Sequence, residues 1–600
     1  MFHRLHELAR CLPERPAWER LNEGLPDLYD RGLALCFATD GTWTGIKTYH
    51  GNQGVLYRSG PSNGTDFTPC CKLAKDTANR LAKAVASCVG APEFSPEQRD
   101  WLNKSLQTFK DNQAAIWAKV EKARQEADID DKTHRGYVYW ADEAMRPVHG
   151  WPEMREALVR QVTESFADKG GARDAGCCAV CGRAPVRVYG NYTVLACYNL
   201  NNRGSIAGGF RANAAHRNFP VCNDCALSIA ETVTFVEKNF SSSLTGHPLR
   251  RNKKITELTY FIIPYSNNLE VREQMSCRLV KNTDRYRLSK VKDLVSDELE
   301  LVDEFSDCGD QIAFSLIFFE KSQASWRIKA EIQELLPSRL HELHAAARAI
   351  ERAPDLIAVS KKDEQPVRIS ALTFKTFAGG SDHASEETLR DWLAALFAGE
   401  SILRRHLLHA LVARLIDTGK RNPTLLHWMT RQAWGLYRYA RQVRFILDDS
   451  MEALPAMSDA IPNSPYGHYV REHADFFLRP ELVVAFLTGC YAAQVTSVQR
   501  QERGADPFAK KFIGRVLTRQ HLRRLYREGH AKLAQYGKLG YVIAGLDPDL
   551  ANAWVVCGET WAIGDEEATF AFTIGYSLAY RIKQLAAAGE TEDNLGEDTP

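Results

Sequence analysis

Two Cys-x-x-Cys pairs constrain the fold of this chain more than any other feature. The first is Cys178-Ala-Val-Cys181 and the second is Cys222-Asn-Asp-Cys225, with residues 182–221 between them. Pairs at this spacing can supply four thiolates to a tetrahedral zinc ion, and four sulfur ligands leave no open position for chemistry on the metal. We therefore expect a structural zinc ion at Cys178, Cys181, Cys222 and Cys225 that clips a long insertion.

Three further side chains keep the ligand set open at this point. Cys177 and Cys197 are spare thiols that could replace Cys178, and His216 is the other nearby candidate. A redox role for the two pairs is the alternative to metal binding. It is disfavoured because neither pair follows a strand and opens a helix, which is the context of redox motifs.

Length and composition indicate a globular chain of several domains. Six hundred residues exceed one ordinary core, and 44% apolar with 25% charged residues is typical of soluble proteins. The formal net charge is +1, so nucleic-acid binding would have to come from local basic clusters. The start of the chain lacks a signal-peptide layout, and no apolar run approaches the roughly 20 residues of a membrane span. We expect a cytoplasmic protein without a membrane partner.

The order of patterns predicts an α+β N-terminal domain with a four-cysteine zinc-binding insert, followed by a mainly α-helical C-terminal bundle. Strands are expected near residues 33–58, as a hairpin, and at 258–264 and 311–319, where β-branched and aromatic residues gather. From Trp326 onward the apolar spacing favours helix, interrupted at Pro337. The predicted boundaries are 1–345 for the N-terminal domain (insert 176–240), 346–455 for a helical middle region, 456–588 for the helical C-terminal domain and 589–600 for a disordered acidic tail.

Two polar segments of the first half are candidates for DNA contacts. Within the insert, a glycine-rich stretch at 203–210 lets the backbone approach a partner closely, and it lacks the spacing of a nucleotide-binding loop. Its neighbours that suit phosphates and base edges are Asn201, Asn202, Arg203 and Arg211. Lys72 follows a turn-rich loop at 57–66 and is a further candidate. The alternatives are a glycine turn within the zinc module and an ordinary surface turn.

A basic repeat near the C-terminus is a third candidate. Its members recur every four residues, namely Lys511, Arg515, Arg519, Arg523 and Arg527. On a helix this spacing drifts by only about 40° per step and forms one slowly winding stripe, which suits a single strand of phosphates. The alternative is a solvated helix face.

A second basic helix is expected around Trp434. It interleaves Trp434, Tyr437 and Tyr439 with four arginines, Arg431, Arg438, Arg441 and Arg444. Aromatic residues at helical spacing are more often core than a stacking surface, so both interpretations stay open.

Catalytic motifs are not found along the chain. There is no Gly-x-Ser-x-Gly elbow, no His-Glu-x-x-His and no phosphate-binding loop. We therefore expect no enzymatic activity. The rival interpretation is a zinc-stabilised nuclease in which His216 joins a His-Cys metal site.

Several segments together resemble the large subunit of type I-B CRISPR Cascade complexes. In the zinc stretch these are Cys178-Ala-Val-Cys181-Gly, Arg203-Gly-Ser-Ile-Ala-Gly-Gly-Phe210, Arg217-Asn-Phe-Pro-Val-Cys-Asn-Asp-Cys225 and Tyr260-Phe-Ile-Ile-Pro264. The order of the family continues through Phe314–Ser322, Ile328–Leu340, Pro507–Lys511 and Asp565–Phe570 leading to Gly575. The zinc stretch is the specific part of this resemblance.

The resemblance implies a non-catalytic subunit of an RNA-guided complex. Such a subunit recognises the motif flanking a target in double-stranded DNA, and its helical C-terminal domain supports the displaced single strand. Base pairing with the CRISPR RNA supplies most sequence specificity. The implied partners are a repeated backbone subunit, a subunit that binds the guide 5′ end, a small subunit and a recruited nuclease-helicase.

Overall fold

The computed structural model describes two compact units. The first consists of Met1–Ser242, Thr259–Leu288 and Gln311–Glu331, and the second of Ser243–Leu258, Ser289–Asp310 and Ile332–Pro600. The residues described are 2–12, 15–60, 65–74, 76–130, 134–167, 172–190, 212–217, 219–243, 249–251, 254–256, 259–281, 306–322, 325–359, 364–378, 383–447, 464–542 and 544–596.

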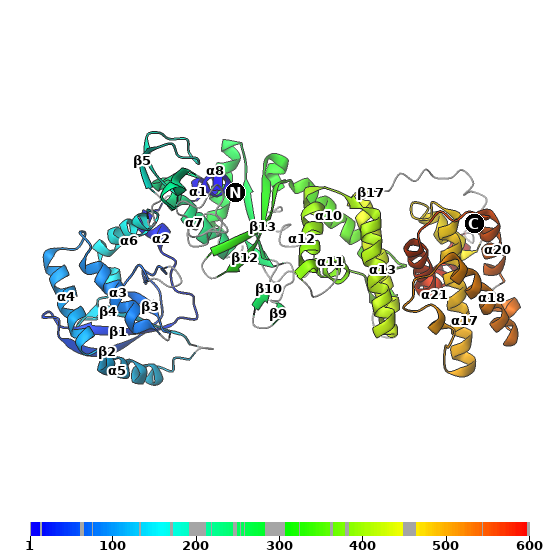
Figure 1. The fold of residues 1–600 in the computed structure, drawn as a ribbon, viewed down its shortest axis with the longest axis horizontal. Helices are drawn as coiled ribbons and strands as arrows, with labels where there is room; N and C mark the ends of the chain where they lie inside the picture. Colours follow the sequence, from blue (N-terminus) through cyan, green and yellow to red (C-terminus); the bar gives the residue numbers. More distant parts are fainter. Residues whose placement is uncertain are drawn as a thin grey trace. The chain divides into compact units, whose positions relative to one another are not determined.

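A four-stranded sheet forms the core of the first unit's N-terminal part (Figure 1). Its order is β2 (Trp43–His50), β1 (Arg31–Phe37), β4 (Gly136–Asp142) and β3 (Cys70–Lys72). β1 pairs antiparallel with β2, which confirms the predicted hairpin, and parallel with β4. The long connection that the parallel pair requires carries three helices, α3 (Thr77–Val89), α4 (Pro96–Asp111) and α5 (Gln113–Glu126).

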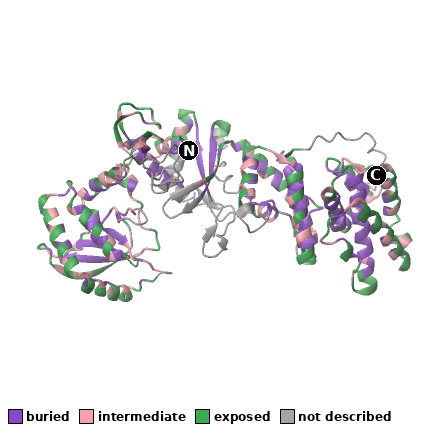
Figure 2. Ribbon diagram, viewed as in Figure 1, coloured by how far each residue is buried: buried purple, intermediate pink, exposed green. Residues whose placement is uncertain are grey.

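The two central strands, β1 and β4, are buried on both faces (Figure 2), whereas the edge strand β2 has no buried residue. Leu33, Leu35 and Phe37 point to the face covered by α3, α4, α5 and α6 (Pro152–Ser165), whereas Ala34 and Cys36 point to the other face. Val55 and Tyr57 cover that second face. Because the residues on both faces of β1 are buried, its sequence is a continuous apolar run.

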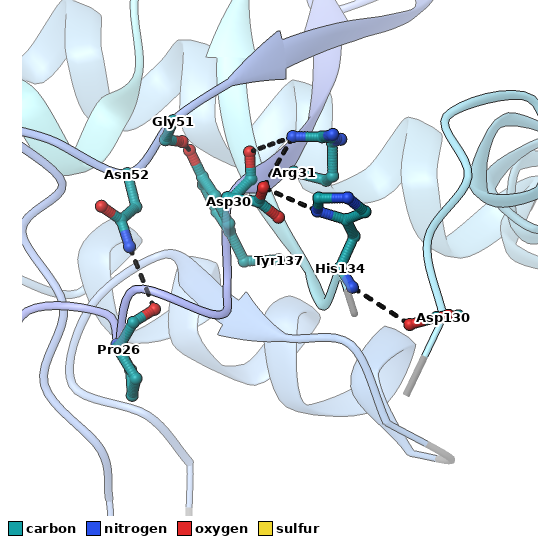
Figure 3. A network of polar contacts seen from close by, with 8 residues as sticks. All are labelled: Pro26, Asp30, Arg31, Gly51, Asn52, Asp130, His134 and Tyr137. Atoms are coloured by element: carbon teal, nitrogen blue, oxygen red, sulfur yellow. Dashed lines mark hydrogen bonds and ion pairs between the residues drawn. The ribbon is translucent and has the colours of Figure 1, made fainter. Parts of the chain in front are cut away.

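A polar network fixes the segments at the start of β1 and β4 (Figure 3). The Asp30 carboxylate accepts from Arg31 Nη1 at 2.7 Å and lies 2.8 Å from His134 Nδ1. The Tyr137 hydroxyl donates to the carbonyl of Gly51 at 2.7 Å, and Asn52 Nδ2 donates to the carbonyl of Pro26 at 3.0 Å. These bonds hold the chain after β2 against the second face of the sheet.

The remaining elements of the first half are helices and further strands, which include two more sheets. A three-stranded sheet has the order β5 (Ala172–Gly176), β6 (Val186–Tyr189), β7 (Val221–Cys222), and a four-stranded sheet has the order β13 (Ser325–Leu335), β12 (Ala313–Ser322), β11 (Thr259–Tyr265), β8 (Ser241–Ser243). β11 and β12 confirm the two predicted strands. The other elements are α1 (Phe2–Cys11), α2 (Ala17–Leu21), η1 (Val148–Gly150), η4 (Ala212–Arg217), α7 (Asn223–Asn239), β9 (Leu249–Arg251), β10 (Lys254–Thr256), α8 (Leu269–Lys281) and η5 (Ser306–Gln311).

The prediction of helix from Trp326 onward is wrong for its first ten residues. Residues 325–335 form strand β13, and the helix α10 (Pro337–Glu351) begins at Pro337 instead of being interrupted there. Ile328, Ala330 and Ile332 alternate with the exposed charged residues Lys329 and Glu331, which is the period of a strand. Proline is favoured in the first turn of a helix, where its missing N–H costs nothing.

The second unit is mainly helical after β13. It contains α10, β14 (Ala358–Val359), β15 (Glu364–Gln365), α11 (Ala371–Phe377), α12 (His383–Ala398), β16 (Ile402–Leu403), α13 (Arg404–Arg421), η6 (Pro423–Leu425), α14 (Leu426–Gln442), β17 (Ile446–Leu447), α16 (Pro465–Glu472), α17 (Pro480–Arg503), η7 (Ala509–Lys511), α18 (Arg519–Gln535), α19 (Leu539–Val542), α20 (Leu546–Cys557) and α21 (Asp565–Gly596). The fold class predicted from the sequence, α+β followed by a helical bundle, is confirmed.

α17 and α21 form the centre of the helical bundle. A Cβ added to Gly489 would lie 2.1 Å from the Phe572 carbonyl oxygen, and one added to Gly575 would lie 2.0 Å from that of Phe486. The two glycines therefore allow the two helices to approach backbone to backbone.

Two helices of the bundle, α17 and α21, differ from what the sequence predicted. α17 is long and apolar enough to cross a membrane by length and composition alone, with a mean hydropathy of 1.3 over 18 residues, but 94% of that window is buried in the bundle. α21 continues to Gly596, so helix covers part of the tail that was predicted to be disordered. Ala and Glu, which are frequent after Gln584, are good helix formers.

Candidate functional site

The four predicted metal ligands lie at one end of the three-stranded sheet. Cys178 and Cys181 occupy the turn between β5 and β6, Cys222 ends β7, and Cys225 lies in the first turn of α7. The second pair therefore does follow a strand and open a helix, which the sequence did not indicate. β6 pairs antiparallel with both β5 and β7, and this pairing brings the two Cys-x-x-Cys pairs together.

Backbone hydrogen bonds shape the first pair into a tight turn. Gly182 N–H donates to the Cys178 carbonyl at 2.9 Å, and Cys178 N–H donates to the Arg183 carbonyl at 2.9 Å. Gly182 has φ of +71°, which a residue without Cβ adopts at little cost. The second pair is attached to the first by the Ala179 N–H bond to the Pro220 carbonyl (2.7 Å) and by the Cys222 N–H bond to Cys178 Sγ (3.3 Å).

The sulfur geometry suits one tetrahedral metal ion. The four Sγ atoms lie within 4.8 Å of one another, and those of Cys181 and Cys222 are 3.8 Å apart. Zinc–sulfur bonds of about 2.3 Å at tetrahedral angles would place the sulfurs roughly 3.8 Å apart. Cys178, Cys222 and Cys225 are buried and Cys181 is half-buried. The four cysteines can therefore hold a metal ion, and their arrangement is compatible with zinc.

Arg183 is the polar side chain that joins the two pairs. Its Nε donates to Cys181 Sγ at 3.3 Å, and its Nη2 donates to Cys222 Sγ at 3.4 Å and to Asp224 Oδ2 at 2.7 Å. Burial opposes ionisation of Cys181, yet the hydrogen bonds from Arg183 favour its thiolate and lower the pKa of this thiol to about 6. Burial raises the pKa of Cys225. A bound cation would allow all four sulfurs to ionise together.

The alternative ligands lie outside this group. The exposed Cys177 donates through its thiol to the Gly182 carbonyl at 3.5 Å. His216 lies in η4 and is not part of the close group of metal-binding side chains found among the described residues. Cys197 lies outside the described residues.

The predicted DNA contacts of the insert, Asn201, Asn202, Arg203 and Arg211, also lie outside the described residues. The ends of that segment are described and lie side by side. A Cβ on Gly190 would be 2.3 Å from the carbonyl carbon of Ala215, so β6 and η4 touch through their backbones. The described residues that flank this segment are therefore in contact at the end of β6.

Lys72 lies on β3 with its ammonium over two aromatic rings. Its Nζ is 4.8 Å from the ring centroid of Tyr57 and 5.3 Å from that of Tyr29. Burial lowers the pKa of Lys72. Part of its charge is therefore engaged by cation–π contacts on the second face of the sheet.

The predicted basic stripe does not lie on one helix. Lys511 ends η7, residues 512–514 form a turn, residues 515–518 are irregular, and α18 begins at Arg519 after the capping residue Thr518. Gly514 has φ of +73°, which interrupts any helix. The break has a packing reason, because Phe512 is buried with its ring 5.1 Å from Phe572 and 4.8 Å from Tyr576 of α21.

The members of the stripe have different surroundings. Lys511 pairs with Glu528, and Arg519 donates to the carbonyls of Gly558 and Glu559. Arg523 lies over the ring of Trp554 at 5.3 Å. Arg515 and Arg527 are exposed and have no ion-pair partner among the residues described. Arg519, Arg523 and Arg527 still share one face of α18, so the stripe is shortened to this helix.

For the helix around Trp434, the core interpretation is confirmed. Trp434, Tyr437 and Tyr439 of α14 are all buried. Arg438 donates to both oxygens of Asp355 at 3.0 and 2.9 Å. These three rings therefore offer no surface on which a base could stack.

Two features of the structure were not found from the sequence. One is the bridging position of Arg183, for which the only local signal is its place directly after Cys181-Gly182. The other is a pair of tryptophans, Trp554 and Trp561, against which Arg523 and Arg519 lie. These contacts join residues that are far apart in the chain, so no short sequence motif indicates them.

The fold and the site define an α+β protein with a closed four-cysteine centre and a C-terminal helical region. Residues 175–335 match the central domain of CRISPR-associated protein TM1802, and residues 374–590 match the C-terminal domain of the same protein. The chain is therefore a CRISPR-associated protein with the central and C-terminal domains of the TM1802 family. No curated protein matches the chain.

Proposed function

We propose that this chain is the large, non-catalytic subunit of an RNA-guided type I-B CRISPR interference complex. It recognises the motif that flanks a target in double-stranded DNA and stabilises the opened R-loop for a recruited nuclease-helicase. The observation that carries the proposal is the match to two CRISPR-associated domains in chain order, the first of which contains all four cysteines.

The metal centre has a structural role in this proposal. Its ion is zinc, and four sulfur ligands fill the coordination sphere, so no position is left for water or substrate. The centre holds the base of the segment that carries Asn201, Asn202, Arg203 and Arg211, the proposed contacts with the flanking motif. This role is supported by the close backbone approach of Gly190 and Ala215, which flank that segment.

The proposed partners follow from the family and from the chemistry of guided recognition. The chain assembles in the cytoplasm with CRISPR RNA, the repeated backbone subunit, the subunit that binds the guide 5′ end and a small subunit. The guide reads the sequence by base pairing, whereas the protein reads the flanking motif and the shape of the duplex.

The test is to purify the tagged full chain from its host and measure three properties of the preparation. The proposal predicts co-purified guide RNA, one zinc ion per chain and no cleavage of target DNA by the complex with magnesium when the nuclease-helicase is absent. Cys178→Ser should lose the metal, whereas the matched control Cys177→Ser should keep it, because only Cys178 belongs to the close sulfur group. Magnesium-dependent cleavage that His216→Ala abolishes would favour the zinc-stabilised nuclease instead.

A further inference from the structure

A surface of the helical unit combines two tryptophans with two arginines. Trp554 of α20 and Trp561, in the segment before α21, have ring centroids 6.1 Å apart and planes inclined by 23°. Arg523 lies 5.3 Å from the centroid of Trp554 and Arg519 5.7 Å from that of Trp561, both from α18. We call these four residues the tryptophan platform.

The platform is partly open to solvent. Trp554 and Trp561 are half-buried, and Arg523 is exposed. Val555, next to Trp554, is 77% exposed, which is unusual for a large apolar side chain. Large aromatic rings at the surface beside arginine are typical of binding sites and not of a closed core.

Hydrogen bonds fix the platform in place. Arg519 donates to the carbonyls of Gly558 and Glu559, and Ala562 N–H donates to the buried carboxylate of Glu481 at 3.0 Å. The segment that carries Trp561 is thereby tied to both α18 and α17. A preorganised aromatic surface loses little conformational entropy when a ligand stacks on it.

The charge of α18 beside the platform is mainly basic. α18 has the basic residues Arg519, Arg523, Arg524, Arg527 and Lys532 and one acidic residue, Glu528. Glu528 forms ion pairs with Lys511 and Arg524. Arg523 and Arg527 have no ion-pair partner in the described part of the chain. The acidic residues of α20 lie at its other end, where Asp547 accepts from Tyr526 and Asp549 accepts from Ser464 N–H. Glu559 is an exposed acid beside the platform.

We propose that the tryptophan platform binds unpaired nucleobases, which stack on Trp554 and Trp561 while Arg523 and Arg527 hold the phosphates of the same strand. Stacking on aromatic side chains is tolerant of sequence, and the neighbouring arginines supply the electrostatic part of the affinity. That this strand is the one displaced from the target rests on the function proposed above.

The test measures binding of the full chain to two labelled oligomers of equal charge, oligo(dT) and an abasic deoxyribose-phosphate chain. The wild type should bind oligo(dT) the more tightly of the two. Trp554→Leu and Trp561→Leu should each weaken oligo(dT) binding about tenfold and leave the abasic oligomer unaffected, since only bases stack. Trp554→Phe should restore part of the loss.

Two arginines of the same helix provide a matched pair. Arg523→Gln should weaken binding of both oligomers and reduce the salt dependence by roughly one phosphate contact. Arg524→Gln removes the same charge from the same helix, but Arg524 pairs with Glu528 and touches neither tryptophan, so it should have the smaller effect. An unchanged thermal unfolding temperature confirms that each variant is folded.

Three results would overturn the inference. The first is equal affinity of the wild type for the two oligomers. The second is that the folded tryptophan variants bind oligo(dT) like the wild type. The third is that an acidic peptide displaces oligo(dT) as readily as it displaces the abasic oligomer. If the guided complex forms normal R-loops after both tryptophans are replaced, the proposed role of the tryptophan platform is wrong but the proposed function stands. A wild-type complex that ignores the flanking motif would overturn the proposed function instead.

Discussion

Arg183 is the residue at which the two cysteine pairs converge. It donates to one sulfur of each pair and to Asp224, which lies between the second pair of cysteines. A metal bound by four thiolates carries a net charge of −2, so a guanidinium in hydrogen-bond contact offsets part of that charge. Residues around the ligands of a metal commonly set its affinity in this way.

Replacing Arg183 should weaken metal retention. We expect Arg183→Ala to lose zinc to a chelator roughly 10- to 100-fold faster than the wild type, measured as metal released over time. Arg187→Ala is the control, because Arg187 makes an exposed ion pair with Asp174 in the same sheet and does not touch sulfur. Equal release rates for the two variants would show that Arg183 has no part in holding the metal.

His149 should make the stability of the N-terminal sheet dependent on pH. Burial lowers the pKa of His149 to about 4, and its ring packs 5.4 Å from that of Tyr139. The unfolded chain binds this proton near pH 6.5 and the folded chain does not, so stability falls as the pH drops from 6.5 toward 4. At pH 5 the loss amounts to about 2 kcal/mol.

The measurement is urea unfolding at pH 7 and pH 5. His149→Phe should lose less stability between these two values than the wild type. His406→Phe, which changes an exposed histidine of α13, is the control and should behave like the wild type. An identical pH dependence for all three proteins would contradict the assignment.

Among single residues, the sequence predicted those whose signal is local. The four cysteines were found because the spacing of each pair is itself the requirement of the metal. The roles of Arg183, Trp554 and Trp561 were not found, because they arise from contacts with Cys222, Arg523 and Arg519 that no spacing encodes.

At the scale of elements, two errors have the same origin. β13 was predicted as helix because Ile332, Leu335 and Leu336 have helical spacing, although residues 328–332 alternate as in a strand. The basic stripe was drawn through residues 512–518 from charge spacing alone, although Phe512 and Leu517 are buried there and impose a turn. In both cases tertiary packing outweighed a periodic pattern of a few residues.

The close approach of α17 and α21 predicts a specific intolerance. Gly575→Ala should destabilise the helical unit by about 1–3 kcal/mol or more, because the added methyl would lie 2.0 Å from the Phe486 carbonyl oxygen and the helices must separate. Gly540→Ala is the matched control, since nothing lies within 4 Å of its added Cβ. Thermal unfolding of both variants tests this, and equal melting temperatures would contradict the packing.

At the scale of the whole molecule, the helices on either side of the predicted boundary at residue 455 share one core. Arg404 of α13 forms an ion pair with Glu567 of α21 at 2.5 Å, and Trp434 and Tyr437 of α14 pack on Phe476 and Phe570. The match to one C-terminal domain over residues 374–590 agrees with this packing. Such contacts between distant segments cannot be read from the order of patterns along the chain.

We propose that this CRISPR-associated protein reads the motif beside a target and keeps the DNA open. The most direct measurement uses the complex purified through the tagged chain and a target duplex whose flanking motif is intact or scrambled. Permanganate reactivity of unpaired thymines reports opening of the duplex. We predict that thymines of the displaced strand become reactive with the intact motif only, and that Asn201→Ala with Arg203→Ala abolishes the difference. Equal opening of both duplexes, or opening by a complex that lacks this chain, would contradict the account.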